Sequence, residues 1–137
     1  MSDSATVSIL DSYALLAYLG GEVGEGRVKE ILHDASFGES RALMSLINLG
    51  EVAYITERER GLAKAQEVLA MVEQLPIKIL PVDRQTVLAA AHVKANFPVA
   101  YADAFAIVAV QEHEGTLITG DPEFESVKDI VQIEWIR

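Results

Sequence analysis

The sequence predicts one α/β domain over residues 1–137, a central, mainly parallel β-sheet flanked by helices as an α/β/α sandwich. Two observations support this fold class. Short β-branched runs alternate with longer helical patterns, and no repeat, low-complexity tract or Pro/Ser-rich linker divides the chain. The 137 residues, half of them hydrophobic, suffice to bury the core of one compact domain.

The predicted strands and helices follow one another along the chain. Five runs have the composition of strands: Val7–Leu10, Arg41–Ser45, Ile77–Pro81, Thr116–Thr119 and Val131–Trp135. Helical spacing of apolar residues predicts Ser12–Leu19, Gly26–Ser36, Leu46–Arg60, Ala63–Leu75, Asp83–Asn96, Tyr101–Glu114 and a short turn of helix at Pro122–Val127. The polar residues Met1–Thr6 are expected to form a frayed end. A flexible connector between the first two helices is predicted at Gly20, Gly21, Gly24 and Gly26.

Composition excludes several classes of protein. The absence of cysteine rules out disulfides, thiolate nucleophiles and cysteine-ligated zinc, and it favours the cytoplasm. The first residues lack the pattern of a signal peptide, and the longest apolar stretch, Val99–Val110, is shorter than the roughly 20 residues of a membrane span. The sequence therefore predicts a soluble, cytoplasmic protein with no membrane partner.

The net charge of −10 argues against broad, charge-driven binding to nucleic acid. Two interpretations remain open for a local group of cations, Arg58, Arg60 and Lys64. They form a small basic patch, or they are solvated helix ends paired with Glu57 and Glu59.

Two aspartates stand where a predicted strand gives way to a helix. Asp11 follows Val7–Leu10, and Asp121 follows Thr116–Thr119 and precedes Pro122. Each position suits a helix N-cap, and Asp-Pro is typical of a cap followed by proline in the first turn. Taken singly, both residues are better explained as caps than as site residues.

Two further acids lie inside apolar helical segments. Ser45, Asn48 and Glu51 follow one another at three-residue steps, which gathers polar groups on one stripe of a helix; this stripe is either its solvent face or part of a site. Asp103 is the only charged residue between Phe97 and Val110. Its alternatives are a first-turn acid that complements the helix dipole and a site carboxylate.

In a parallel sheet the strand ends and the following helix starts share one rim, where ligands bind. Asp11 and Asp121 lie on that rim. Asp103 begins about 11 residues of helix that lead away from the rim, and the strand that follows returns to it, so Asp121 is expected at nearly the level of Asp103. Glu51 is expected to reach the rim from its helix. Four converging acids repel one another unless cations lie between them, and oxygen ligands suit Mg²⁺ or Mn²⁺, which activate water for phosphodiester hydrolysis.

With these residues in this order, the chain from Val7 onward resembles the PIN-domain family, in particular the VapC-type toxins of bacteria and archaea. The four acids stand in ILDSYALLAYL, NLGEV, YADAFA and LITGDPEF. Each motif is weak alone, but the ordered set is specific.

The resemblance implies a Mg²⁺- or Mn²⁺-dependent endoribonuclease that cleaves RNA, forms a homodimer and is neutralised by a cognate antitoxin. Its catalytic metal ligands would be Asp11, Glu51, Asp103 and Asp121. Hydrogen-bonding support for these ligands is expected from Thr119, Ser12 and Asn48.

The alternative function is a non-catalytic, PIN-like module that binds a protein partner, in which the acids are caps and solvated charges. Two other aspartate-dependent classes fit poorly. A haloacid-dehalogenase-like phosphatase needs Asp-x-Asp where this chain has Asp11-Ser12-Tyr13, and a phospho-receiver domain needs an acidic pair and a late lysine.

Overall fold

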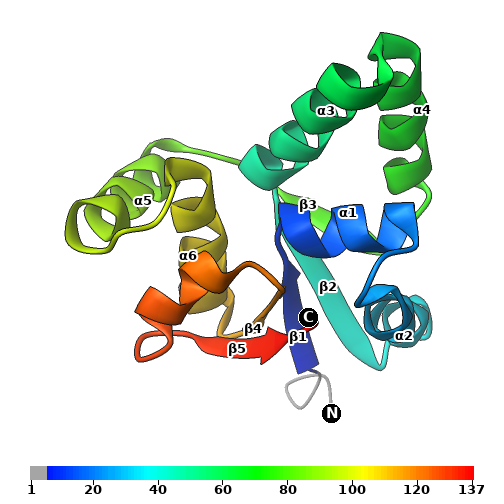
Figure 1. Cartoon of the computed structure of the whole chain (residues 1–137). Coiled ribbons are helices and arrows are strands. Elements are labelled where there is room, and N and C mark those ends of the chain that lie inside the picture. Colours follow the sequence, from blue (N-terminus) through cyan, green and yellow to red (C-terminus); the bar gives the residue numbers. More distant parts are fainter. Residues whose placement is uncertain (1–5) are drawn as a thin grey trace.

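The computed structural model describes residues 6–137 and contains one five-stranded sheet (Figure 1). The strands are β1 (Thr6–Leu10), β2 (Ser40–Ser45), β3 (Ile77–Leu80), β4 (Thr116–Thr119) and β5 (Gln132–Trp135). Their order is β3-β2-β1-β4-β5, and every neighbouring pair is parallel. The predicted parallel α/β sheet is confirmed, and all five carboxyl ends meet at one edge.

The helices are α1 (Ser12–Gly20), α2 (Glu25–Ser36), α3 (Leu46–Arg60), α4 (Leu62–Glu73), α5 (Arg84–Asn96), α6 (Tyr101–His113) and the 3₁₀ helix η2 (Pro122–Val127). Each predicted helix is present, with ends that differ by two residues at most. Asp83 shows one cause of such differences. It precedes α5 and caps it, because its carboxylate accepts a hydrogen bond from the Thr86 N–H at 2.8 Å.

The connector between α1 and α2 is shorter than predicted. Gly20 ends α1 and Gly26 lies inside α2, so the flexible stretch does not extend over all four glycines. Only Gly21 and Gly24 of the four have positive φ, at 64° and 100°, where glycine is favoured. Of the predicted frayed end, residues 1–5 lie outside the described residues, and Thr6 already belongs to β1.

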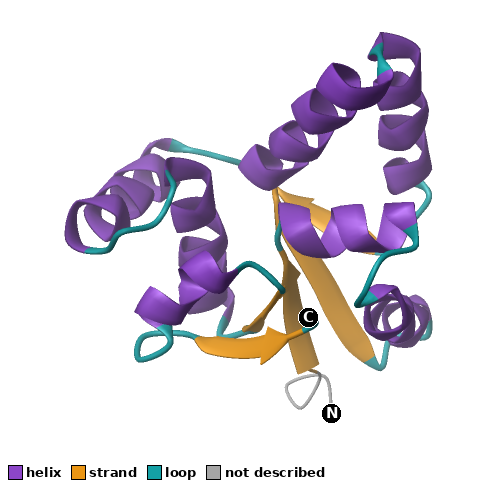
Figure 2. Cartoon of the chain, viewed as in Figure 1, coloured by secondary structure: helices purple, strands orange, loops and turns teal. Residues whose placement is uncertain are grey.

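Helices cover both faces of the sheet, as Figure 2 shows. Helices α5, α6 and η2 enclose one core with β-strand residues such as Ile9 and Leu117. The opposite face packs on α1 and α2 around Leu10 and Ile118, and continues into a cluster shared with α3 and α4. Neighbouring residues of a strand point to opposite faces of the sheet, so the core in which a strand residue is buried shows the face on which its side chain lies.

Helix α6 lies in the centre of its layer. Its residues 103–110 are all buried, as the sequence predicts for a nearly all-round apolar helix. Within residues 6–137 no single helix is long and apolar enough to cross a membrane. Helices α5 and α6 have the length and composition of a membrane span only when taken together, and they are bent by 114° relative to each other.

Candidate active site

Asp11 lies at the carboxyl end of β1 and is 1% exposed. Its Oδ1 accepts a hydrogen bond from the Ala14 N–H at 2.8 Å, so it caps α1 as one of its two interpretations predicts. Its Oδ2 accepts a hydrogen bond from the Thr119 hydroxyl on the adjacent strand β4. An ionised carboxylate has about four acceptor sites, so these two bonds leave capacity for a ligand.

Thr119 connects the acids of two neighbouring strands. Besides donating to Asp11, its Oγ1 accepts the Asp121 N–H at 3.1 Å, and the residue is fully buried. Asp121 in turn accepts the Glu123 N–H at 2.9 Å and caps η2, with Pro122 in the first turn as predicted. The turn also brings Gly120 close to Tyr13. A Cβ on Gly120 would lie 2.3 Å from the outer part of the Tyr13 ring, so a larger residue there requires the ring to move.

The polar stripe of α3 faces inward. Ser45 and Asn48 are 4% and 0% exposed, and Glu51 is half-buried, so the interpretation of this stripe as a solvent face is wrong. Ser45 caps α3 by accepting the Ile47 N–H. The exposed face of the helix carries apolar residues instead, among them Leu46 and Tyr54.

Asn48 joins the two helices that carry Glu51 and Asp103. Its Nδ2 donates to Oε1 of Glu51 at 3.1 Å and to the carbonyl of Ala102 at 3.2 Å. The second bond reaches α6 at the residue before Asp103. The Oδ1 of Asn48 is buried without a hydrogen-bond partner among the described residues. Turning the amide over would bring this oxygen toward two acceptors, so the observed orientation is fixed.

Asp103 lies in the first turn of α6 and is 7% exposed. The residue before this helix, Ala100, has no side chain that can cap it, and the carboxylate of Glu123 accepts the Ala100 N–H instead. Glu123 also lies close enough to Asp103 to raise the pKa of that carboxyl. It is a fifth acid at this rim, which the sequence analysis missed. The available signal was its position two residues after Asp121, in the first turn of the helix that Asp121 caps.

The carboxylates act on one another electrostatically. Burial raises the pKa of Asp11 from 3.8 to about 7, with smaller increases from Asp121 and Glu51, against the lowering effect of the bonds from Thr119 and Ala14. The pKa of Asp103 is raised to about 8. Burial is the main cause, and Glu123, Glu51 and Asp121 raise it further. Since Glu51 and Asp121 affect both buried aspartates, the four acids lie within one electrostatic site.

The donor set fits a hard divalent cation by its chemistry. It consists of carboxylate oxygens, which Mg²⁺ and Mn²⁺ favour. A cation would offset both the burial of these charges, which is the main cause of the raised pKa values, and their mutual repulsion. Within residues 6–137 no three Asp, Glu or His side chains already stand close enough to clasp a metal ion. Asp11, Asp121 and Glu51 each direct an oxygen toward a protein donor, and each carboxylate keeps further acceptor sites for a cation.

The remaining charged candidates lie elsewhere. Lys64 pairs with Glu67 at 3.3 Å, and the guanidinium of Arg58 lies 5.3 Å from the centre of the Tyr54 ring, so the predicted pairing with Glu57 and Glu59 is wrong for these two cations. Arg60 and Lys64 instead border a groove between α1 and the α3–α4 pair, with a volume of about 490 Å³. Its apolar walls include Leu16, Leu19, Ile55, Val68 and Met71.

Comparison with known proteins gives a family and a set of structural neighbours. A family model of the PIN domain matches residues 8–130. The fold is similar to that of a chain in VapBC2 from Rickettsia felis bound to a promoter DNA fragment, with a TM-score of 0.76 at 12% identity over 96% of this chain and 100% of that one. For DNA-bound VapBC from Salmonella typhimurium the TM-score is 0.74 at 17% identity, over 96% and 99% of the two chains.

A third neighbour is VapC20 from Mycobacterium tuberculosis, a toxin that cleaves the sarcin-ricin loop. Its TM-score is 0.69 at 14% identity, over 88% of this chain and 94% of that one. At these identities the neighbours show a shared fold. No curated protein sequence matches the chain significantly.

Proposed function

Because the chain belongs to the PIN domain family, we propose that it is a Mg²⁺- or Mn²⁺-dependent endoribonuclease that hydrolyses RNA phosphodiesters. Ribonuclease activity and the use of divalent cations are typical of this family. One observation carries the proposal for this chain. Acids from four different elements affect one another's charge at the carboxyl edge of the sheet, where parallel α/β folds bind ligands.

The residues that would hold the cations are Asp11, Glu51, Asp103 and Asp121. A bound cation supplies an activated water and stabilises charge on the phosphate. The protein's own contribution is to fix the carboxylates. Thr119 orients Asp11, and Asn48 holds Glu51 while tying α3 to α6. Ser12 stays a prediction as a supporting residue, and its side chain makes no hydrogen bond within residues 6–137.

The test compares the wild-type protein with Asp103→Asn on fragments of transfer and ribosomal RNA, with Mg²⁺, with Mn²⁺ and with a chelator. Cleavage should require the cation and fall by several orders of magnitude in the variant. The matched control is Asp34→Asn, which removes the same charge from α2, where Asp34 faces only His33 at 4.0 Å. Cleavage that survives both the chelator and Asp103→Asn would rule out the metal site.

We further propose that the protein is the cytoplasmic toxin of a toxin–antitoxin pair, since VapBC complexes are among its structural neighbours. The groove between α1 and the α3–α4 pair suits an amphipathic antitoxin segment, because charged residues of both signs border its apolar walls: Glu22, Glu59, Arg60 and Lys64. Met71→Glu in this groove should weaken antitoxin binding without changing RNA cleavage. Unchanged antitoxin affinity would place the partner elsewhere.

We propose that two copies of the chain form a homodimer through the exposed apolar face of α3. Leu46, Gly50 and Tyr54 lie along this face at four-residue spacing. Sedimentation analysis should find a dimer for the wild-type protein and a monomer for Leu46→Glu. A dimer in both would exclude this face.

The second candidate function is a non-catalytic, protein-binding PIN module. The observation that favours it is the capping role of Asp11 and Asp121, which gives both residues a structural use without any metal. Binding of a protein partner by a chain that cleaves no RNA, with or without cations, would favour this function over the nuclease.

A further inference from the structure

Trp135 and Arg137 form a stacked pair beside the carboxylate site. Trp135 is the last residue of β5 and lies opposite Thr119 in the parallel pairing with β4. The next backbone N–H, that of Ile136, donates to the carbonyl of Thr119 at 3.0 Å. The guanidinium of Arg137 lies 4.0 Å from the centre of the Trp135 ring. Adjacent strands are about 4.8 Å apart, so the pair adjoins the residue that orients Asp11.

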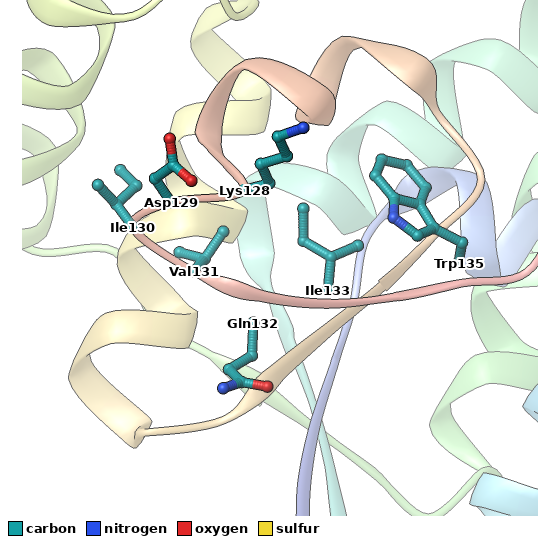
Figure 3. A pocket seen from close by; sticks show the side chains of 7 residues that line it. All are labelled: Lys128, Asp129, Ile130, Val131, Gln132, Ile133 and Trp135. Carbon is teal, nitrogen blue, oxygen red and sulfur yellow. The ribbon is translucent and has the colours of Figure 1, made fainter.

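The indole lies on the same face of the sheet as the acids. Trp135 and Ile133 pack against the core of α6 and η2, whereas Ile136 belongs to the core of the opposite face. Figure 3 shows Trp135 and Ile133 on the side of β5 that faces η2, with Gln132 on the other side. Thr119 shares this face with Trp135 because residues paired across parallel strands point the same way.

An open cavity extends from Trp135 along the outer edge of β5 (Figure 3). Its volume is about 450 Å³, and its lining includes Lys128, Ile130 and Trp135. Since β5 is the last strand of the sheet, no further strand of the described chain covers this edge. The cavity holds one cation and one acid, Lys128 and Asp129, and it ends at Trp135. Arg137 stacks on the Trp135 ring and also pairs with Glu125 at 3.1 Å, so the plane of its guanidinium and not a free charge is what this end of β5 offers to a ligand.

We propose that the Trp135–Arg137 pair is the stacking platform for an unpaired base of the RNA substrate, next to the phosphate that the carboxylate site hydrolyses. The inference rests on the proposed nuclease function and names how that site holds its substrate. Stacking on aromatic and guanidinium planes is available to every base and needs no net positive charge on the protein. Such stacking would give this acidic chain an attraction for RNA that does not depend on its net charge of −10.

Trp135 is the only tryptophan of the chain, so its fluorescence reports on the platform directly. The test titrates the cleavage-defective Asp103→Asn protein in Mg²⁺ with a ten-nucleotide single-stranded RNA. Saturable quenching is expected with this RNA, and none with pyrophosphate at the same phosphate concentration. Binding detected by the anisotropy of labelled RNA, with the Trp135 emission unchanged, would overturn the proposal.

Two substitutions test the same platform by affinity. Trp135→Leu and Arg137→Gln should each weaken RNA binding roughly 5- to 150-fold, the range measured for the loss of one stacked base. In the otherwise wild-type nuclease both should act mainly by raising KM. Because Arg137 is exposed, its replacement tests the proposal even if Trp135→Leu fails to fold.

The matched control is Arg27→Gln. Arg27 of α2 pairs with Glu134, a residue of β5 whose side chain lies on the face of the sheet away from Trp135. The loss of this guanidinium should leave RNA affinity unchanged. If the wild-type protein cleaves RNA while both platform variants keep its KM, this inference alone fails. If the wild-type protein neither binds nor cleaves RNA, the nuclease function fails with it. Loss of antitoxin binding alone in the two variants would assign the pair to the protein partner and overturn the proposal.

Discussion

Replacing Asp11 with asparagine should stabilise the metal-free protein at neutral pH and abolish RNA cleavage. The carboxylate is 1% exposed, and burial raises its pKa from 3.8 to about 7. An asparagine keeps an oxygen for the Ala14 N–H and an amide that can donate to the Thr119 hydroxyl, but it carries no charge to bury. The variant therefore removes the electrostatic cost and retains the cap.

The sign and size of the effect follow from linkage. Below pH 4 the carboxyl of Asp11 is protonated in both states, and its ionisation costs no stability. As pH rises toward 7, the unfolded chain has lost this proton while the folded protein still holds it, so the free energy of unfolding falls by about 1.4 kcal/mol per pH unit. The fall is complete above pH 7. Between pH 5 and pH 8 it amounts to about 2–3 kcal/mol for this group.

The assay is urea unfolding in chelator at pH 5, 6, 7 and 8, followed by Trp135 fluorescence. The wild-type protein should lose about 2–3 kcal/mol more than Asp11→Asn over this range. The comparison between the two proteins cancels the general repulsion of a chain with net charge −10. Mg²⁺ should restore stability to the wild-type protein only. Parallel pH profiles for the two proteins would refute the reasoning.

Three further substitutions test the groups that position the acids. Thr119→Val removes a donor to Asp11 and an acceptor for the Asp121 N–H. It should lower the free energy of unfolding in urea by about 1–3 kcal/mol and also lower kcat. If the stability and kcat are both unchanged, Thr119 does not orient Asp11. Asn48→Ala should lower kcat about 10- to 100-fold and weaken the binding of Mg²⁺ measured by calorimetry, because Asn48 holds Glu51 and links α3 to α6. Unchanged Mg²⁺ binding would contradict this role of Asn48. Gly120→Ala should lower the Tm, because its Cβ would meet the Tyr13 ring at 2.3 Å, and adding Tyr13→Ala should recover part of that loss. If the double variant recovers nothing, the contact with this ring is not the cause of the loss.

The order of elements could be predicted because it depends on local patterns. Period-two and helical spacing of apolar residues are properties of short segments, and all five strands and seven helices appear where these patterns stand. The shared rim of the acids followed from parallel pairing, which is a rule of topology. The inward face of the α3 stripe could not be decided, since a polar stripe at this spacing fits either solvent or a site.

Contacts between distant segments could not be predicted. Glu123 meets Ala100 across 23 positions, and Asn48 meets Ala102 across 54. The stacking of Arg137 on Trp135 depends on how β5 ends against Thr119. Each of these residues has an ordinary local explanation, such as a helix end or an edge strand, and only the three-dimensional arrangement brings it to the site.

The capping bonds and the proposed metal ligation support each other. A cap places a carboxylate against backbone N–H groups at the positive end of a helix, which favours its ionised form and fixes its position. At Asp11 the bonds from Ala14 and Thr119 lower a pKa that burial raises, whereas Glu123 raises that of Asp103 further. The caps therefore hold Asp11 and Asp121 in place before any cation binds. Asp103 is not a cap, and its pKa is raised to about 8, so a cation would favour its ionised form.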